Sequence, residues 1–132
     1  MVMTTELIRD AVAAEASGDV RILAVYLLGS GAVGRLRPDS DVDVAVMPVP
    51  GTIISALDRA DFAHALSYRL GRSVDAGELS SRNLVYANET IHKGVRLYTR
   101  DADAADLYAA TLLGMYVVFN EGRQEIMRGY TV

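Results

Sequence analysis

Two aspartates one residue apart, Asp41 and Asp43, are the first residues in this chain whose types and spacing suggest chemistry. The run Asp41–Val46 alternates strictly, which predicts a strand with both carboxylates on one face. Positions i and i+2 on a strand lie about 6.5 to 7 Å apart, so both side chains can reach a shared cation or a pair of cations. Two such cations can stabilise the attacking and leaving oxygens of a phosphoryl displacement. The pair is consistent with a magnesium platform, and an exposed acidic strand face is the alternative.

The hexapeptide GSGAVG, residues 29–34, precedes these acids and matches the dinucleotide-binding pattern G-x-G-x-x-G. A dinucleotide fold needs a full helix after the glycines, but only residues 35–37 separate Gly34 from Pro38. A P-loop is also excluded, because Arg35 and Leu36 stand where lysine and serine or threonine would bind phosphate and magnesium. What remains is a short Gly-Ser turn between a buried strand and the acid-bearing strand.

Gly29-Ser30, ten residues and then Asp41-Val42-Asp43 together resemble the signature of the DNA polymerase β-like nucleotidyltransferase superfamily. The longer stretch GSGAVGRLRPDSDVDVAV is similar to the minimal nucleotidyltransferases of prokaryotic toxin–antitoxin pairs. Those proteins commonly read Gly-Ser-x-Ala-x-Gly and then Pro-Asp-Ser-Asp-x-Asp. The resemblance extends more loosely over residues 20–101.

This resemblance implies ATP as substrate, two Mg²⁺ ions, and transfer of AMP with release of pyrophosphate. It assigns the triphosphate to the Gly-Ser turn, the metals to the paired acids, and assistance in deprotonating the attacking hydroxyl to a third acid on a neighbouring strand. The nucleotide-binding residues expected from it are Gly29, Ser30, Ser40 and Arg35, and the expected catalytic and metal-binding residues are Asp41, Asp43 and Asp75.

The third acid is where the sequence departs from its relatives, which often read like Val-Asp-Leu-Val-Asp-Leu. Here Asp75 is followed by Ala76-Gly77-Glu78, and a glycine inside a strand weakens it or marks a bulge. Glu78 is the alternative third acid, although in a regular strand it would face away from Asp75.

Other polar side chains are secondary candidates. The loop lacks an arginine that relatives often carry, which leaves Arg35 or Arg37 as substitutes, or a weakened activity. His64 and His92 lie within helical patterns distant from the signature, so we expect both to be outside the site.

The elements that must position these residues follow from hydrophobic periodicity and from turn residues. We expect helices at about 4–17, 52–70 (ending at Gly71), from Ser80 or Ser81 to Lys93, and 103–128, and strands at 21–28 (buried on both faces), 41–46 (closed by Pro48 and Pro50), 72–79 and 95–98. The expected fold is α/β (α+β), a polymerase β-like nucleotidyltransferase fold with a small mixed sheet flanked by helices, in a single domain over residues 1–132.

Composition restricts the partners and the compartment. A net charge of −4 argues against direct binding of long nucleic acids, and the absence of cysteine excludes disulfides and thiolate sites. The N-terminus does not resemble a signal peptide, and the apolar run Leu112–Phe119 is much shorter than the roughly 20 residues of a membrane span. We expect a cytoplasmic protein without a membrane partner.

The resemblance further implies an antitoxin of a type VII-like pair that transfers AMP to a tyrosine hydroxyl of a cognate HEPN ribonuclease toxin. An acidic antitoxin suits a basic RNA-cutting partner. The alternatives are a non-catalytic antitoxin that acts by occlusion and a small-molecule (aminoglycoside-type) nucleotidyltransferase, which the lack of a separate acceptor domain disfavours. The apolar stripe of the last helix, from Tyr108 to Phe119, fits either a core or an interface.

Overall fold

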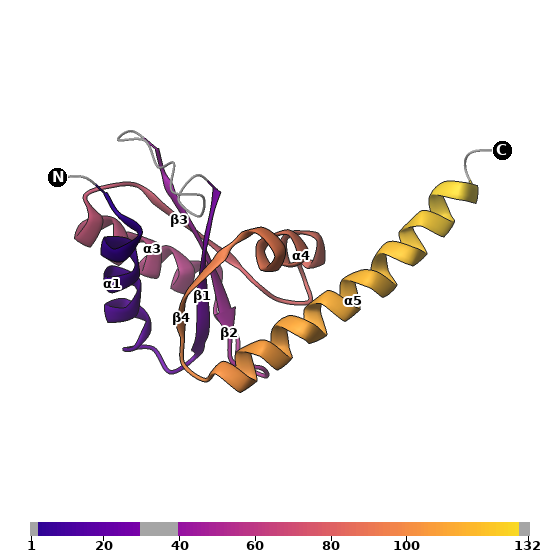
Figure 1. Ribbon diagram of the computed structural model, residues 1–132, viewed down its shortest axis with the longest axis horizontal. Coiled ribbons are helices and arrows are strands. Elements are labelled where there is room, and N and C mark those ends of the chain that lie inside the picture. The colour runs from indigo at the N-terminus through magenta and orange to yellow at the C-terminus, as the bar shows by residue number, and fades with distance from the viewer. Residues whose placement is uncertain (1–2, 30–39, 130–132) are drawn as a thin grey trace.

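The computed structural model describes residues 3–29 and 40–129. The elements in chain order are α1 (Thr5–Ala16), β1 (Ile22–Leu28), β2 (Val42–Pro48), α3 (Ala56–Leu70), β3 (Val74–Glu78), α4 (Leu84–Lys93), β4 (Val95–Thr99) and α5 (Ala102–Gly129). Within the described residues the strands form one sheet in the order β3-β2-β1-β4, in which β1 runs antiparallel to β2 and β4, and β2 runs parallel to β3. The predicted fold class, a small mixed sheet flanked by helices, is confirmed (Figure 1).

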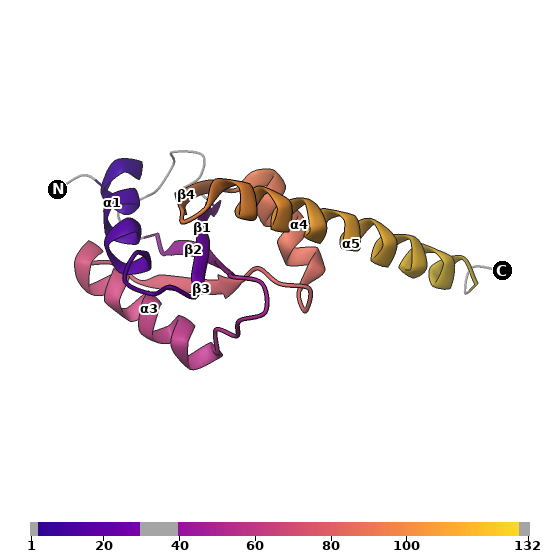
Figure 2. The same cartoon turned by 90° about the horizontal axis from the view of Figure 1, so that it is seen from below.

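The sheet has a hydrophobic cluster on each face. On one face the β2 valines Val42, Val44 and Val46 pack with side chains of α1 and α3. On the other face Ala45 and Met47 pack with side chains of α4 and of the N-terminal half of α5. The prediction that β1 is buried on both faces is confirmed, since all its residues except Leu28 are buried. Figures 1 and 2 show the two pairs of helices on opposite sides of the sheet.

Helix α3 begins and ends where polar and glycine residues satisfy its terminal backbone groups. Ser55 and Asp58 form a reciprocal capping box at the N-terminus, which explains why the helix starts at Ala56 rather than at residue 52. Gly71 closes the C-terminus with φ 64°, a left-handed conformation that glycine adopts without penalty. The predicted end of this helix is confirmed.

Helix α4 begins later than predicted, and the prediction that Ser80 or Ser81 caps it is wrong. The Leu79 N–H still donates to the Val46 carbonyl at 2.9 Å, so the chain leaves the sheet only after residue 79. A turn follows, in which the Asn83 N–H donates to the Ser80 carbonyl at 3.1 Å. Asn83 then stands at the N-cap without a side-chain hydrogen bond.

The two halves of helix α5 lie in different environments, one buried and one exposed. Ala105, Ala109 and Leu112 are buried against the body, whereas the C-terminal half extends away from it (Figures 1 and 2). By length and composition alone α5 is able to cross a membrane, with a mean hydropathy of 1.3 over its most apolar window. Its N-terminal half is nevertheless part of the protein core, and its C-terminal half leaves Val118 and Met127 exposed.

Candidate active site

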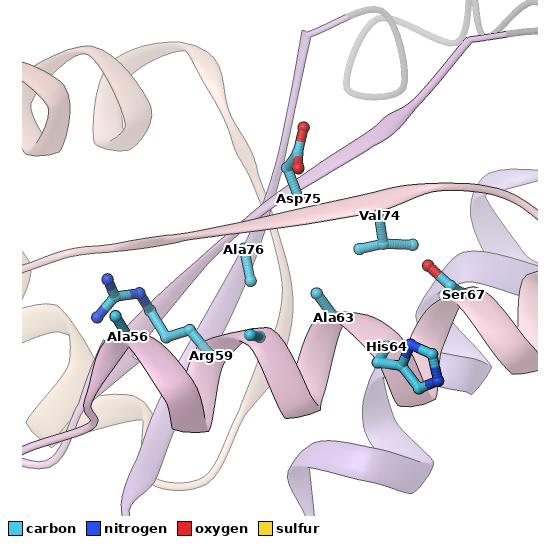
Figure 3. A pocket seen from close by; sticks show the side chains of 9 residues that line it. Ala56, Arg59, Ala63, His64, Ser67, Val74, Asp75 and Ala76 are labelled. Atoms are coloured by element: carbon cyan, nitrogen blue, oxygen red, sulfur yellow. The ribbon is translucent and has the colours of Figure 1, made fainter.

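Two carboxylates lie opposite each other on neighbouring strands. In the parallel pairing of β2 with β3, Asp43 is the direct partner of Asp75. The residues on either side of Asp43 are buried valines, so its carboxylate points to the face that α4 covers. Figure 3 shows Asp75 pointing away from α3, whereas Val74 and Ala76 point toward it. The predicted alternation is therefore confirmed from Val42 to Val46, and Asp43 and Asp75 lie on the same face of the sheet. Asp41, predicted as part of this strand, is exposed just before β2 begins.

The carboxylates act on one another electrostatically. Partial burial, then the negative charges of Asp75 and Asp41, raise the pKa of Asp43 above its ordinary value. Among the described residues, none of the ion pairs contains Asp41, Asp43 or Asp75. The sheet thus holds a cluster of like charges that the described part of the protein does not neutralise, which is an arrangement suited to binding cations.

A hollow of about 400 Å³ opens over this pair of acids. Its walls come from the end of β1, the middle of β2 and β3, and the start of α4. The lining residues are Leu28, Asp43, Val44, Asp75, Ala76, Gly77, Asn83 and Tyr86. We call this space the acid hollow.

Gly77 lines the acid hollow, and this position has no room for a side chain because the Tyr86 ring lies directly beside it. A Cβ added at Gly77 would lie 2.2 Å from the Tyr86 hydroxyl oxygen and 2.7 Å from the ring carbon that bears it. The predicted bulge or weakening at Gly77 is not what the structure shows, since β3 pairs with β2 in unbroken register from Val74 to Glu78. The missing side chain instead lets α4 place an aromatic ring against the floor of the hollow.

Glu78, the alternative third acid, is engaged elsewhere. Its carboxylate oxygens bind Arg59 at 2.9 Å and Arg82 at 2.6 Å. Burial alone would raise the pKa of Glu78, but hydrogen bonds from Ser80 and Arg82 and the charges of Arg82 and Arg59 outweigh it and hold the pKa below its usual value. Glu78 therefore joins α3 to the segment before α4, and Asp75 is the acid that faces Asp43.

Of the predicted nucleotide-binding residues, the structure describes Gly29 and Ser40 but not Ser30 and Arg35. Gly29 directly follows β1 with φ 65°, and a Cβ there would lie 3.5 Å from Oδ2 of Asp43, so the glycine brings backbone beside the acids. The carbonyl of Ser40 accepts a hydrogen bond from Arg72 at 3.4 Å. Ser30 and Arg35, like Arg37, lie outside the described residues. The nucleotide-binding roles of all these residues stay predictions.

Both histidines lie away from the acid hollow. His64 lines a separate hollow of about 370 Å³ between α3 and β3, which Asp75 also borders through its backbone side (Figure 3). Nδ1 of His92 lies 2.8 Å from the Asn88 carbonyl oxygen on the exposed side of α4. Neither imidazole is among the groups that face Asp43.

Comparison with known proteins agrees with this geometry. The sequence pattern of the family described as polymerase beta, nucleotidyltransferase matches residues 11–103. The chain belongs to this family. It is a nucleotidyltransferase, and the matched region contains the acid-bearing strands β2 and β3.

One related protein and two solved structures are similar to this nucleotidyltransferase over most of its length. The protein adenylyltransferase MntA of Shewanella oneidensis is 27% identical over 107 residues, which are 81% of this chain and 75% of MntA. A crystal structure of a toxin–antitoxin complex with AMP-PNP matches at 25% identity with a TM-score of 0.70, covering 96% of this chain and 94% of the other. A structure of a tri-AMPylated Shewanella oneidensis HEPN toxin in complex with its MNT antitoxin matches in fold, at 21% identity with a TM-score of 0.76, over 98% of this chain and 100% of the other.

The residues around the acid hollow fit a divalent cation by their chemistry. Carboxylate oxygens are the ligands that hard cations such as Mg²⁺ prefer, and a cation would offset both the partial burial and the repulsion from Asp75 and Asp41 that raise the pKa of Asp43. Within residues 3–29 and 40–129, no group of three or more His, Cys, Asp or Glu side chains is already gathered as a metal cluster. The nucleotidyltransferase therefore presents donors of a suitable kind rather than a closed cage.

Tyr86 lines the acid hollow and is not among the site residues expected from the sequence. Tyr86 lies on α4, eleven residues beyond Asp75, and nothing in its helical spacing distinguishes it from a core aromatic. The unusual Gly77 was the available signal, because a glycine in a strand also marks a site where another group approaches closely.

Proposed function

We propose that this nucleotidyltransferase is an antitoxin that transfers AMP from ATP to a tyrosine hydroxyl of a cognate HEPN ribonuclease toxin, as part of a type VII-like toxin–antitoxin pair. The observation that carries the proposal is the register of β2 and β3, which pairs Asp43 with Asp75 at the floor of an open hollow. The similarity to an adenylyltransferase and to toxin–antitoxin complexes supports the choice of nucleotide and acceptor.

In this proposal the chain's own residues bind and orient the two reactants. Gly29 and Ser30 hold the triphosphate, with Ser40 and Arg35 as further contacts, and Asp41, Asp43 and Asp75 hold two Mg²⁺ ions. When bound, these ions neutralise the charge that develops on the phosphoryl oxygens. The tyrosine oxygen forms a bond to the α-phosphorus of ATP while the bond from that phosphorus to the bridging oxygen breaks. The phenolic proton passes to the carboxylate of Asp75, and pyrophosphate leaves.

The C-terminal half of α5 is the surface that we assign to the protein partner. Val118, Ile126 and Met127 are 70%, 64% and 61% exposed, on a helix that extends beyond the body (Figure 1). Large apolar side chains in one exposed stretch are typical of an interaction site. A helical surface of this kind suits a protein acceptor that docks from outside, and it gives the net negative chain an apolar contact that does not depend on charge.

Two alternatives make different predictions for the same site. An antitoxin that acts by occlusion alone would need the α5 surface but not the carboxylates. An aminoglycoside-type enzyme would need the carboxylates but no protein partner, and among the described residues the acid hollow is open rather than enclosed around a small acceptor. We also propose a cytoplasmic location, because both ATP and a ribonuclease toxin act there.

Transfer of radiolabel tests the proposal directly. The chain and its genomic neighbour are incubated with α-labelled ATP and magnesium, using the wild type and an Asp41→Ala/Asp43→Ala variant. Label on the neighbour's tyrosine that requires both aspartates is the expected result. If no label transfers while the variant still neutralises the toxin, occlusion replaces catalysis as the function.

A further inference from the structure

A second hollow, of about 330 Å³, lies between the end of β1 and α4. Its lining residues are Leu28, Gly29, Tyr86, Glu89, Thr90 and Lys93. Leu28 and Tyr86 also line the acid hollow, so the two spaces share these side chains as a common wall. We call the second space the α4 hollow. None of the residues that α4 contributes to it belongs to the nucleotide-binding set expected from the sequence.

The walls of the α4 hollow have the chemistry of a site for a flat heterocycle. Leu28 and the Tyr86 ring are apolar and partly buried against the second hydrophobic cluster. At the rim, the Lys93 ammonium lies 3.1 Å from the Glu89 carboxylate, and both side chains are well exposed. An aromatic wall stacks favourably on a nucleobase, and a few polar groups at the edge fix the orientation of a ligand.

Thr90 supplies a buried hydroxyl in the same wall, since the residue is 1% exposed. Burial raises the pKa of the neighbouring Tyr86 phenol, and an interaction with the Thr90 hydroxyl partly offsets that rise, so the two hydroxyls lie close together. Thr90 therefore adds a polar group to a wall that Leu28 and the Tyr86 ring otherwise form.

Gly29 connects the two hollows. It lines the α4 hollow, and its backbone also passes beside Oδ2 of Asp43 in the acid hollow. A ligand that occupies both spaces passes the wall that Leu28 and Tyr86 share, and Gly29 next to Leu28 has no side chain to obstruct it. The phosphate end belongs with the acids, where cations can bind, because the Glu89–Lys93 ion pair at the α4 rim has no net positive charge to attract a polyphosphate. The uncharged end then falls in the α4 hollow.

We propose that the α4 hollow is the nucleoside subsite of this enzyme, which deepens the proposed function and rests on it. The base packs against the Tyr86 ring, Glu89 accepts a hydrogen bond from an exocyclic amine, and Lys93 donates to a ring nitrogen. An ionised carboxylate can only accept hydrogen bonds, so this edge selects a base with an amino group there, such as adenine, over one with a carbonyl, such as guanine.

Direct binding measurements separate the two subsites. Mg²⁺ complexes of ATP, GTP and inorganic tripolyphosphate are titrated calorimetrically into the wild type and into a Glu89→Ala/Lys93→Ala variant. Both positions are exposed, so the variant should fold. A Glu6→Ala/Arg9→Ala variant on the exposed side of α1 removes the same two charges at a distance and serves as the matched control. The expected result is about a tenfold weaker Kd for ATP in the α4 variant, since two hydrogen bonds are lost, with tripolyphosphate affinity unchanged within twofold.

Two outcomes overturn the subsite. One is an unchanged Kd for ATP in the α4 variant, and the other is an equal loss for ATP and tripolyphosphate, which would place the polyphosphate there instead. A Glu89→Gln variant gives a second readout that does not depend on lost affinity, because the amide can also donate and should reduce the preference for ATP over GTP.

The same samples distinguish failure of the subsite from failure of the proposed function. If the wild type binds ATP through Glu89 and Lys93 but labels no partner, the subsite stands and the transfer reaction is wrong. If the wild type labels its partner and the α4 variant does so with an unaltered KM for ATP, the transfer reaction stands and the subsite is wrong. If the wild type binds no ATP, both are wrong.

Discussion

The acid-bearing strands and the C-terminal half of α5 have opposite relations to the fold. Asp43 is held between Val42 and Val44, which are 0% and 1% exposed in the centre of the sheet. Val118 of α5 is 70% exposed on a helix that leaves the body (Figure 2). On β2 the buried neighbours fix the position of a side chain that belongs to neither hydrophobic cluster. On the C-terminal half of α5 (residues 116–129), which we call distal α5, apolar side chains are present without a core to enter.

The difference shows how one short chain separates chemistry from recognition. Carboxylates that must keep a fixed spacing lie on strands whose other face is locked into the core, because positioning to within a fraction of an ångström requires rigid support. The docking surface that we propose needs area more than rigidity, and it lies on a helix whose second half does not pack into the core. The two regions should therefore respond differently to substitution.

Asp43→Asn should produce the largest effect at the acid-bearing strands. We expect transfer of AMP to fall by about 10³-fold, because a charge that stabilises the transition state is removed. Stability should not fall with it. The folded pKa of Asp43 is raised above the ordinary value of 3.8, so its contribution to stability is full below that value and is lost as pH rises through the folded pKa.

Urea unfolding at pH 7 and at pH 3.5 measures this pH dependence. The Asn variant should be as stable as the wild type or more stable at pH 7, and the difference should disappear at the lower pH. A variant that is clearly less stable at pH 7 would mean that the carboxylate makes a stabilising contact, which is contrary to the arrangement described above.

Val118→Asp, on distal α5, should weaken binding of the protein partner and leave the stability of the fold almost unchanged. A charge placed in the centre of an apolar interface should weaken binding of the protein partner by at least about tenfold, while the free energy of unfolding changes by no more than about 0.5 kcal/mol. Leu57→Asp is the matched control, because Leu57 is 71% exposed on α3, on the other side of the sheet. Calorimetric binding to the partner toxin checks both variants, and equal weakening in the two would remove distal α5 as the docking surface.

Glycine-to-alanine substitutions in the two regions should change the free energy of unfolding in opposite directions. Gly77→Ala brings a methyl group into the Tyr86 phenol and should destabilise the fold by about 1–3 kcal/mol. Gly122→Ala, on distal α5, meets nothing within 4 Å and should stabilise the helix by about 0.5–1 kcal/mol. Thermal unfolding of the two variants gives both values. A neutral Gly77→Ala would show that Tyr86 moves aside without cost.

Local sequence patterns predicted most of the scaffold, including the alternating strand at Asp43 and the helix that ends at Gly71. What they did not predict depends on contacts between distant segments. The partners of Glu78 are Arg59 and Arg82, one of them nineteen positions earlier, and the side chain that fills the space at Gly77 comes from a helix that begins only at Leu84. The sequence also left undecided whether the last helix belongs to the core or to an interface, because periodicity identifies the apolar face of a helix but not what covers that face.

The place of Asp75 on the outermost strand of the sheet has a consequence for how such proteins can change over time. β3 is held on one side by β2, and Val74 and Ala76 pack toward α3 whatever residue stands between them. Because the Asp75 side chain is exposed, a neutral residue in its place would leave the scaffold intact while removing the acid opposite Asp43. On the proposed function, a single codon change at position 75 therefore separates an antitoxin that modifies its target from one that only covers it, and neither form requires a different fold.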